Sequence, residues 1–195
     1  MQVVFHRRNT ISELKAITSD LGVEVDIRSF GKRLIINHDP YKESIDFEDW
    51  LIHYNHKLLI LNVKEEGLEE RLLILMNKYN IENFFFLDQS FPLIIKTISN
   101  GESRTCIRVS EYESIETAIK LSGKAKWVWV DFFNYFPLDY ESFLKLKEAK
   151  FKLCLVSPEL QGHPYSKVDS LKNQLKKMEI NFDAVCTKDP NLWRG

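Results

Sequence analysis

Two pairs of polar residues are spaced so that each pair can act together. Glu24 and Asp26 are two residues apart within an apolar run, and Asn62 and Lys64 have the same spacing in another run. Side chains two apart on a β-strand point to the same face, so each pair projects into one space. Two converging carboxylates repel each other unless a proton or a cation lies between them. A hard divalent ion with oxygen ligands, Mg²⁺ or Ca²⁺, is the cation that this pattern favours.

The elements that must position these residues are short β-rich runs that alternate with helical patterns along the whole chain. Between the runs, apolar residues recur at the 3.6-residue spacing of helices, as in Leu68, Leu72, Leu75 and Tyr79. The predicted strands are Gln2–Phe5, Val23–Ile27, Leu58–Val63, Asn83–Leu87, Thr105–Val109, Lys126–Val130, Lys152–Val156 and Ala184–Cys186.

Alternating β and α elements predict an α/β fold with parallel strands joined by right-handed crossovers. Eight such units close into a compact (β/α)8 TIM barrel, which we predict as a single domain over residues 1–195. The length is just below the usual lower end of about 200 residues for this fold, so the loops must be short. An open doubly wound sheet is the alternative, but no glycine-rich phosphate loop follows any predicted strand.

The composition is that of a folded protein with balanced charge. Lys and Arg number 27 against 28 Asp and Glu, and this net charge of −1 excludes a global attraction to nucleic acid or to an anionic membrane. No apolar run reaches the roughly 18 residues of a membrane span, and the first residues do not resemble a secretory signal. Cys106, Cys154 and Cys186 each lie in an apolar run, which predicts buried free thiols and a cytoplasmic protein.

In a TIM barrel the active site is built at the carboxyl ends of the strands. Beyond the first two pairs, the polar residues at the predicted strand ends are His6, Arg7, Asp88, Ser110, Asp131, Ser157, Glu159 and Thr187. Asp131 and Glu159 are candidates for substrate contact. Trp129 is a candidate for ligand stacking, although its run is first of all a core strand. An ion pair with Arg7, Arg28 or Lys64 is the alternative for the two carboxylates.

Several segments together resemble the glycerophosphodiester phosphodiesterases, a TIM-barrel family related to phosphatidylinositol-specific phospholipase C. The resemblance begins with His-Arg-Arg-Asn-Thr at positions 6–10 and Gly-Val-Glu-Val-Asp at 22–26. It continues with a short strand ending in His-Asp at 34–39 and with Leu-Asn-Val-Lys at 61–64. The closing motif is Asp-Ala-Val-Cys-Thr at 183–187. The order of these segments makes the combination specific.

The resemblance implies how the residues would act on a phosphodiester. His6 and His38 would be the general acid and base, and Arg7 and Lys64 would bind phosphate oxygens. Asp39 would orient His38 through a hydrogen bond, unless it only caps a turn. The chemistry is reasonable in itself, because a phosphodiester needs its charge neutralised and its leaving oxygen protonated by a group that titrates near neutral pH.

The resemblance also implies a divalent cation, Mg²⁺ or Ca²⁺, held by Glu24, Asp26 and Asn62. Asn62 departs from the family, which has an acidic residue there. An amide oxygen can still coordinate, but the lower ligand charge weakens the expected affinity. Asn62 could also simply form a hydrogen bond in the core. Arg8 replaces the usual glycine, and the segment that many members insert after His-Asp is missing, so the mouth of the barrel is more open or a partner subunit helps to hold the substrate.

These observations predict a metal-dependent phosphodiesterase that acts on a small glycerol- or sugar-linked phosphodiester. The main alternative is a degenerate relative that binds a phosphorylated ligand without turnover. A weaker alternative is an enzyme of another class that uses the barrel mouth on sugars or nucleotide-linked intermediates.

Overall fold

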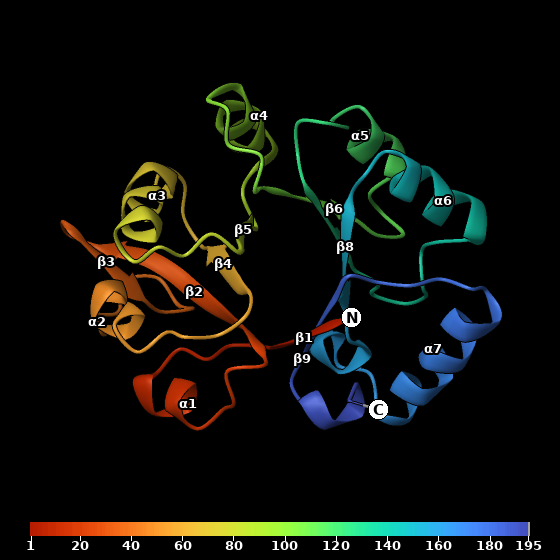
Figure 1. The fold of residues 1–195 in the computed structure, drawn as a ribbon, viewed down its shortest axis with the longest axis horizontal. Coiled ribbons are helices and arrows are strands. Elements are labelled where there is room, and N and C mark those ends of the chain that lie inside the picture. Colours follow the sequence, from red (N-terminus) through yellow and green to blue (C-terminus); the bar gives the residue numbers. More distant parts are fainter. Residues whose placement is uncertain (195) are drawn as a thin grey trace.

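The computed structural model describes residues 1–194, and in that part of the chain eight parallel strands surround a common interior (Figure 1). The strands are β1 Gln2–Phe5, β2 Gly22–Phe30, β3 Arg33–Ile36, β4 Leu59–Val63, β5 Phe84–Leu87, β6 Cys106–Val109, β7 Trp127–Val130, β8 Lys152–Val156 and β9 Ala184–Thr187. The helices are α1 Ile11–Lys15, α2 Phe47–Leu51, α3 Glu69–Lys78, α4 Phe91–Ser99, α5 Ile115–Ile119, α6 Tyr140–Glu148 and α7 Ser166–Lys177, with short 3₁₀ turns η1 Pro158–Gln161 and η2 Pro190–Leu192.

The strand order is that of a (β/α)8 barrel. Neighbouring strands follow the order β5-β4-β2-β1-β9-β8-β7-β6, and a parallel bridge between Phe86 and Thr105 joins β5 to the chain just before β6. This seam, the single-bridge junction of Phe86 with Thr105, completes the ring. The barrel predicted from the alternating pattern is therefore confirmed, and the open doubly wound sheet is excluded.

The one antiparallel strand among the described residues, β3, extends the wall beside β2. β2 continues to Phe30, beyond the predicted end at Ile27, because its last residues pair with β3 in a hairpin. Gly31, with a φ of 61°, begins the two-residue turn and adopts the left-handed conformation without the clash that a Cβ atom would cause. The hairpin returns the chain to the level of Asp26, where the Asn37 amide donates to the Asp26 carbonyl over 3.1 Å.

The barrel interior is filled by alternate residues of the strands, as a strand period of two requires. Val4, Ile60 and Phe85 belong to one buried cluster with Trp127 and residues of the later strands. The Phe85 and Trp127 rings stack across it with centroids 4.6 Å apart. All three cysteines are buried and free, which confirms their prediction as core thiols.

The helices cover the outer faces of the strands in two groups. In one apolar cluster, α1, α2 and α3 pack on β2, β4 and β5. In the second, the four helices α4, α5, α6 and α7 pack on the later strands (Figure 1). No helix in residues 1–194 is long and apolar enough to cross a membrane.

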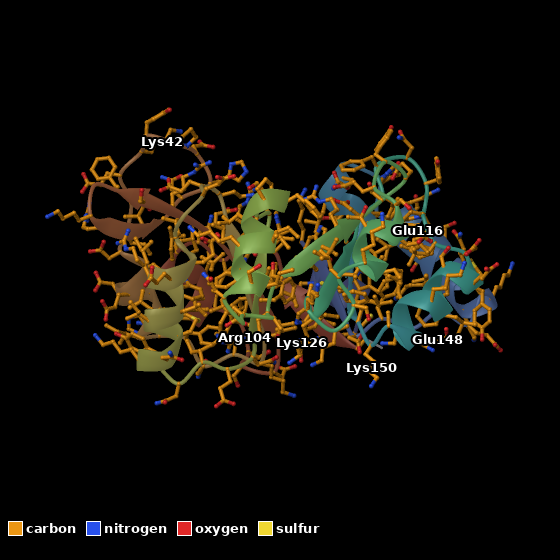
Figure 2. The ribbon with its side chains drawn as sticks, turned by 90° about the horizontal axis from the view of Figure 1, so that it is seen from above. Lys42, Arg104, Glu116, Lys126, Glu148 and Lys150 are labelled. Atoms are coloured by element: carbon orange, nitrogen blue, oxygen red, sulfur yellow. The ribbon has the colours of Figure 1, made fainter. Side chains whose placement is uncertain are left out.

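The two ends of the barrel can be followed in Figure 2. Arg104, Lys126 and Lys150 each precede a strand and lie together on one side, which is the amino end of the barrel. Lys42, which follows the β3 hairpin, lies on the opposite side, at the carboxyl end. The functional candidates lie at this second end.

Candidate active site

A cavity of about 400 Å³ opens at the carboxyl end of the barrel. One wall comes from the first strands, and the other comes from β5 to β9. The polar and charged residues that line it are His6, Arg7, Glu24, Asn62, Lys64, Asp88, Arg108, Asp131, Gln161 and Lys188, with Trp129 and Phe133 among the others. Most of the residues that the strand ends predicted are thus brought to one space, where four cationic side chains face the cavity.

Glu24 is fully buried and holds the first wall together. Its carboxylate accepts a hydrogen bond from the Arg7 amide and another from Nδ2 of Asn62, each over 2.7 Å. His6 Nε2 lies 3.8 Å from Glu24 Oε2. Burial and the neighbouring Asp26 charge raise the pKa of Glu24 to about 7. Glu24 is therefore a carboxyl group whose protonation changes near neutral pH.

Asp26 is also fully buried, and its surroundings are cationic. Arg7 Nε lies 3.3 Å from one carboxylate oxygen, and Lys64 Nζ lies 3.6 Å from the other, Oδ1. Asn9 fixes the residue from both sides: its Nδ2 donates to Oδ2 over 2.8 Å, and its Oδ1 accepts the Asp26 amide over 3.1 Å. The ion pairs expected as the alternative to a metal are therefore present in part.

Two buried oxygens of this wall have no hydrogen-bond partner, Asp26 Oδ1 and Asn62 Oδ1. They belong to adjacent strands at the same register position, since Asp26 pairs with Asn62. Unpartnered buried oxygens are costly in free energy, and a hard cation is one partner that would satisfy them. No group of three or more His, Cys, Asp and Glu side chains forms a metal site within residues 1–194. The donor set, two carboxylates and an amide, fits Mg²⁺ or Ca²⁺ with a low ligand charge.

The backbone at Arg7 is held in an unusual conformation. Its φ is 58°, in the left-handed region that residues other than glycine seldom adopt. This turn directs the Arg7 amide to the Glu24 carboxylate, while the Arg8 amide donates to the Glu24 carbonyl over 2.9 Å. Strained backbone of this kind is concentrated at functional sites.

The two candidate histidines have different surroundings. His6 lines the cavity, and burial together with the Arg7 charge lowers its pKa to about 4, so its imidazole is neutral at pH 7. His38 is nearly half exposed, at 46% of its side chain, and its Nδ1 lies 3.0 Å from Asp39 Oδ1. Hydrogen bonds from Lys42 and His38 lower the pKa of Asp39 to about 2.

His38 lies at the same end of the barrel as His6, but outside the described lining of the cavity. It follows Asn37, whose amide contacts the Asp26 carbonyl, and its own carbonyl accepts a hydrogen bond from Arg28 Nε over 3.0 Å. The structure thus brings the backbone of the second histidine to the site's rim. Its imidazole faces solvent and Asp39.

The opposite wall is a chain of ion pairs. Asp88 accepts a hydrogen bond from Lys64 Nζ over 3.0 Å and is also paired with Arg108. Arg108 continues to Asp131 at 3.6 Å, and Gln161 Nε2 donates to Asp131 over 2.7 Å. Burial raises the pKa of Asp131. The predicted substrate-contact residues Asp131 and Trp129 both line the cavity.

Glu159 has a different place from the one predicted for it. Its carboxylate accepts hydrogen bonds from the Thr187 hydroxyl at 2.6 Å, from the Lys188 amide at 3.0 Å and from the Ser157 hydroxyl. Ser157 in turn accepts from Trp193 Nε1 over 2.7 Å. Glu159 is buried, and its neighbours in η1, not Glu159 itself, line the cavity. Its hydrogen bonds connect η1 to the residues that end β9 and follow it.

The sequence reasoning missed Asn9, Arg108 and Lys188. Arg108 is the single charged residue of the apolar strand β6, and this is the signal that would have found it. Asn9 belongs to the quoted motif at 6–10, but its double contact with Asp26 depends on the fold. Lys188 follows the last strand and donates to the Glu159 carbonyl over 3.1 Å.

Comparisons with solved structures identify proteins with the same fold. A candidate glycerophosphodiester phosphodiesterase from Galdieria sulphuraria superimposes with a TM-score of 0.69 at 18% identity, covering 98% of this chain and 96% of its own. The glycerophosphodiester phosphodiesterase from Agrobacterium tumefaciens C58 has a TM-score of 0.69 at 12% identity over 99% of both chains. A glycerophosphoryl diester phosphodiesterase from Parabacteroides distasonis has a TM-score of 0.64 at 10% identity, over 98% and 84%.

The chain has the TIM-barrel fold of these proteins. At such low identity the similarity shows the fold alone. No protein-family model matches the sequence, and no curated protein matches it.

Proposed function

We propose that this protein is a phosphoric diester hydrolase, similar to glycerophosphodiester phosphodiesterases, which acts on a small glycerol- or sugar-linked phosphodiester. The observation that carries the proposal is the cavity at the carboxyl end of the barrel. There a neutral imidazole, four cationic side chains and the buried carboxylates of Glu24 and Asp131 surround one space. The proposal is also supported by the solved structures with this fold, which are named as glycerophosphodiester phosphodiesterases.

The phosphate would be bound by the cations of the cavity. Arg7 is half exposed and Lys64 lies between Asp26 and Asp88, so each can exchange part of its carboxylate contact for a phosphate oxygen. A guanidinium and an ammonium placed before the reaction stabilise the charge that develops on the phosphoryl oxygens. Arg108 and Lys188 complete a cationic ring around the anion.

The proton transfers are assigned to the two histidines. His6, neutral at pH 7, would accept the proton of the nucleophile, which is water or a hydroxyl of the substrate itself. His38, whose imidazole faces solvent outside the cavity lining, would turn toward the cavity and protonate the leaving oxygen. Asp39 would keep the Nδ1 proton of that ring in place and leave Nε2 for the transfer.

A divalent cation would be held by Glu24, Asp26 and Asn62. When bound it supplies Lewis-acid polarisation of the phosphoryl oxygens. Glu24 must be ionised to act as a ligand, and its position between the Arg7 amide and Asn62 fixes the orientation of its carboxylate. The specific metal, Mg²⁺ or Ca²⁺, is part of the proposal.

The second candidate function is binding of a phosphorylated ligand without turnover. Two observations favour it: an amide stands where a third carboxylate would strengthen the cation site, and Arg7 and Lys64 already neutralise Asp26. In this case the cavity would retain the phosphate contacts, and the weak cation site would contribute little.

The deciding experiment measures release of a phosphomonoester from glycerol phosphodiesters by the purified protein, with Mg²⁺ or Ca²⁺ and with a chelator. We expect turnover that disappears with the chelator and in His6→Ala. His53→Ala is the matched control, because His53 precedes β4 at the amino end of the barrel. Rates that survive both the chelator and His6→Ala would refute the proposal. Phosphate binding without turnover on any diester would support the second candidate.

A further inference from the structure

A second cavity, of about 600 Å³, adjoins the candidate active site. It lies at the carboxyl end of β5 and along β6, between the starts of α4 and α5, which flank that part of the barrel in Figure 1. Both cavities are lined by Leu87, Asp88 and Arg108. A ligand whose phosphate occupies the first cavity therefore has a second space directly beside it.

The division between the two cavities is polar and tied to the phosphate site. Arg108 is paired with Asp88 and lies 3.6 Å from Asp131, so its guanidinium connects the two spaces. Asp88 also pairs with Lys64, a proposed phosphate-binding residue. The backbone of Asp88 is in the left-handed region with a φ of 62°. A substrate that spans this pair would touch both cavities through the same two side chains.

The lining of the second cavity combines aromatic rings with hydrogen-bonding groups. Tyr112 and Phe91 line it and are 73% and 49% exposed, respectively. The Tyr112 ring also lies 5.9 Å from the ring of Phe133, which lines the first cavity. Thr117 and Glu113 contribute a hydroxyl and a carboxylate on the side of α5.

This combination matches a polyhydroxylated ring. A sugar has apolar C–H faces that pack on aromatic rings, and its hydroxyl groups pair with carboxylates and hydroxyls at the edges. Glu113 Oε2 already accepts the Ser110 hydroxyl over 2.9 Å, but its other oxygen and the Thr117 hydroxyl would gain no partner from a purely apolar group. A cationic head group is disfavoured because Arg108 stands in the same wall and Asp88 is already paired with two cations.

We propose that the second cavity binds the sugar half of a phosphodiester whose phosphate lies in the first cavity. The inference rests on the proposed function, and it narrows the substrate class to sugar-linked phosphodiesters. Tyr112 and Thr117 are then specificity-determining residues: the ring of Tyr112 supports the sugar face, and the Thr117 hydroxyl pairs with a sugar hydroxyl.

The test compares binding of inorganic phosphate, glycerol 3-phosphate, phosphocholine and a hexose 1-phosphate to the full chain by calorimetry. We expect the hexose 1-phosphate to bind about tenfold more tightly than glycerol 3-phosphate, a difference of about 1.4 kcal/mol. Thr117→Val and Tyr112→Ala should each remove a large part of that preference and leave the affinity for glycerol 3-phosphate unchanged.

Tyr140→Ala is the control, because Tyr140 is an exposed tyrosine at the start of α6 that lines neither cavity. Thermal unfolding verifies that each variant is folded. Phosphate binding without a hexose preference, or a preference that both variants retain, would overturn the sugar subsite and leave the phosphate site intact. Tighter binding of phosphocholine than of the hexose would assign the cavity to a cation and also overturn it. Absence of phosphate binding altogether would overturn both proposals.

Discussion

Glu24 and Glu159 are both buried glutamates near the carboxyl end of the barrel, one on β2 and one just after β8. They differ in the hydrogen-bond donors and the charges that surround each carboxylate. Glu159 accepts hydrogen bonds from two hydroxyls and a backbone amide, and none of these partners carries a negative charge. Glu24 accepts one backbone and one side-chain hydrogen bond, and it shares its strand face with Asp26.

The difference explains why one carboxyl group is suited to chemistry and the other to structure. A carboxylate surrounded by donors is stable in its charged form, and removing the charge leaves those donors without an acceptor. A buried carboxylate beside another one is destabilised in its charged form, and the pKa of Glu24 is accordingly raised to about 7. Such a group binds a proton or a cation readily, which is the behaviour that a ligand-binding site requires.

The largest effect is expected from Glu24→Gln. The neutral amide cannot contribute charge to a cation site, so kcat/KM on a glycerol phosphodiester should fall by about 10²–10³-fold. The melting temperature should fall less than in Glu159→Gln, because the loss of one acceptor oxygen is offset by removal of a buried charge that Asp26 repels. Initial rates and thermal unfolding of the same preparation check both parts. Full activity in this variant would exclude Glu24 from the site.

Glu159→Gln should have the opposite profile. Because the amide nitrogen of glutamine cannot accept the hydrogen bond that the Ser157 hydroxyl donates, we expect the free energy of unfolding to decrease by about 1–3 kcal/mol. The kcat/KM of the folded protein should change much less than in Glu24→Gln. Urea unfolding monitored by fluorescence of the four tryptophans gives the stability. A variant with normal stability and lost turnover would show that Glu159 acts in the active site and would contradict its structural role.

The contrast also explains what the sequence could predict. Glu24, Asp26 and their partners on β4 were found because a strand period of two is a local property, and the barrel itself followed from the alternation of strands and helices. The structural role of Glu159 depends on Thr187, 28 residues away, and on the contact of Ser157 with Trp193, 36 residues away. No local pattern contains those contacts.

The same reasoning applies to His38. The short strand before His38 was expected from the resemblance alone, since the alternating pattern predicted no strand between Ile27 and Leu58. The orientation of its imidazole depends on the pairing of Asp39 with Lys42 and on Arg28 holding the backbone, which a list of residue types does not reveal.

Asn62→Asp tests whether the first wall is a weakened cation site. A third carboxylate should tighten Mg²⁺ or Ca²⁺ binding by about tenfold, as measured by calorimetry. Asn83→Asp is the matched control, because it adds the same charge at the amino end of the barrel, before β5. Equal affinity in Asn62→Asp and the wild type would mean that Asn62 is not a ligand.

The smallest expected effect is the pH dependence of cation binding. Glu24 must lose its proton to bind a cation, and with a pKa of about 7 its ionised fraction falls as the pH decreases. Affinity should therefore decrease by about fourfold between pH 8 and pH 6.5, and binding at the lower pH should release protons. Calorimetry in two buffers of different ionisation enthalpy measures both quantities. Binding that is independent of pH over this range would contradict the role of Glu24 as the titrating ligand.

The junction of Phe86 with Thr105 has a consequence for the motions of the molecule. The other neighbouring strands are in register over two or more residues in the described chain, whereas this junction has a single bridge, so the wall separates there at the lowest cost in backbone hydrogen bonds. The two apolar clusters on either side are each held by their own helices. Local opening of the wall is therefore expected first at this junction, between β5 and β6, beside the two cavities.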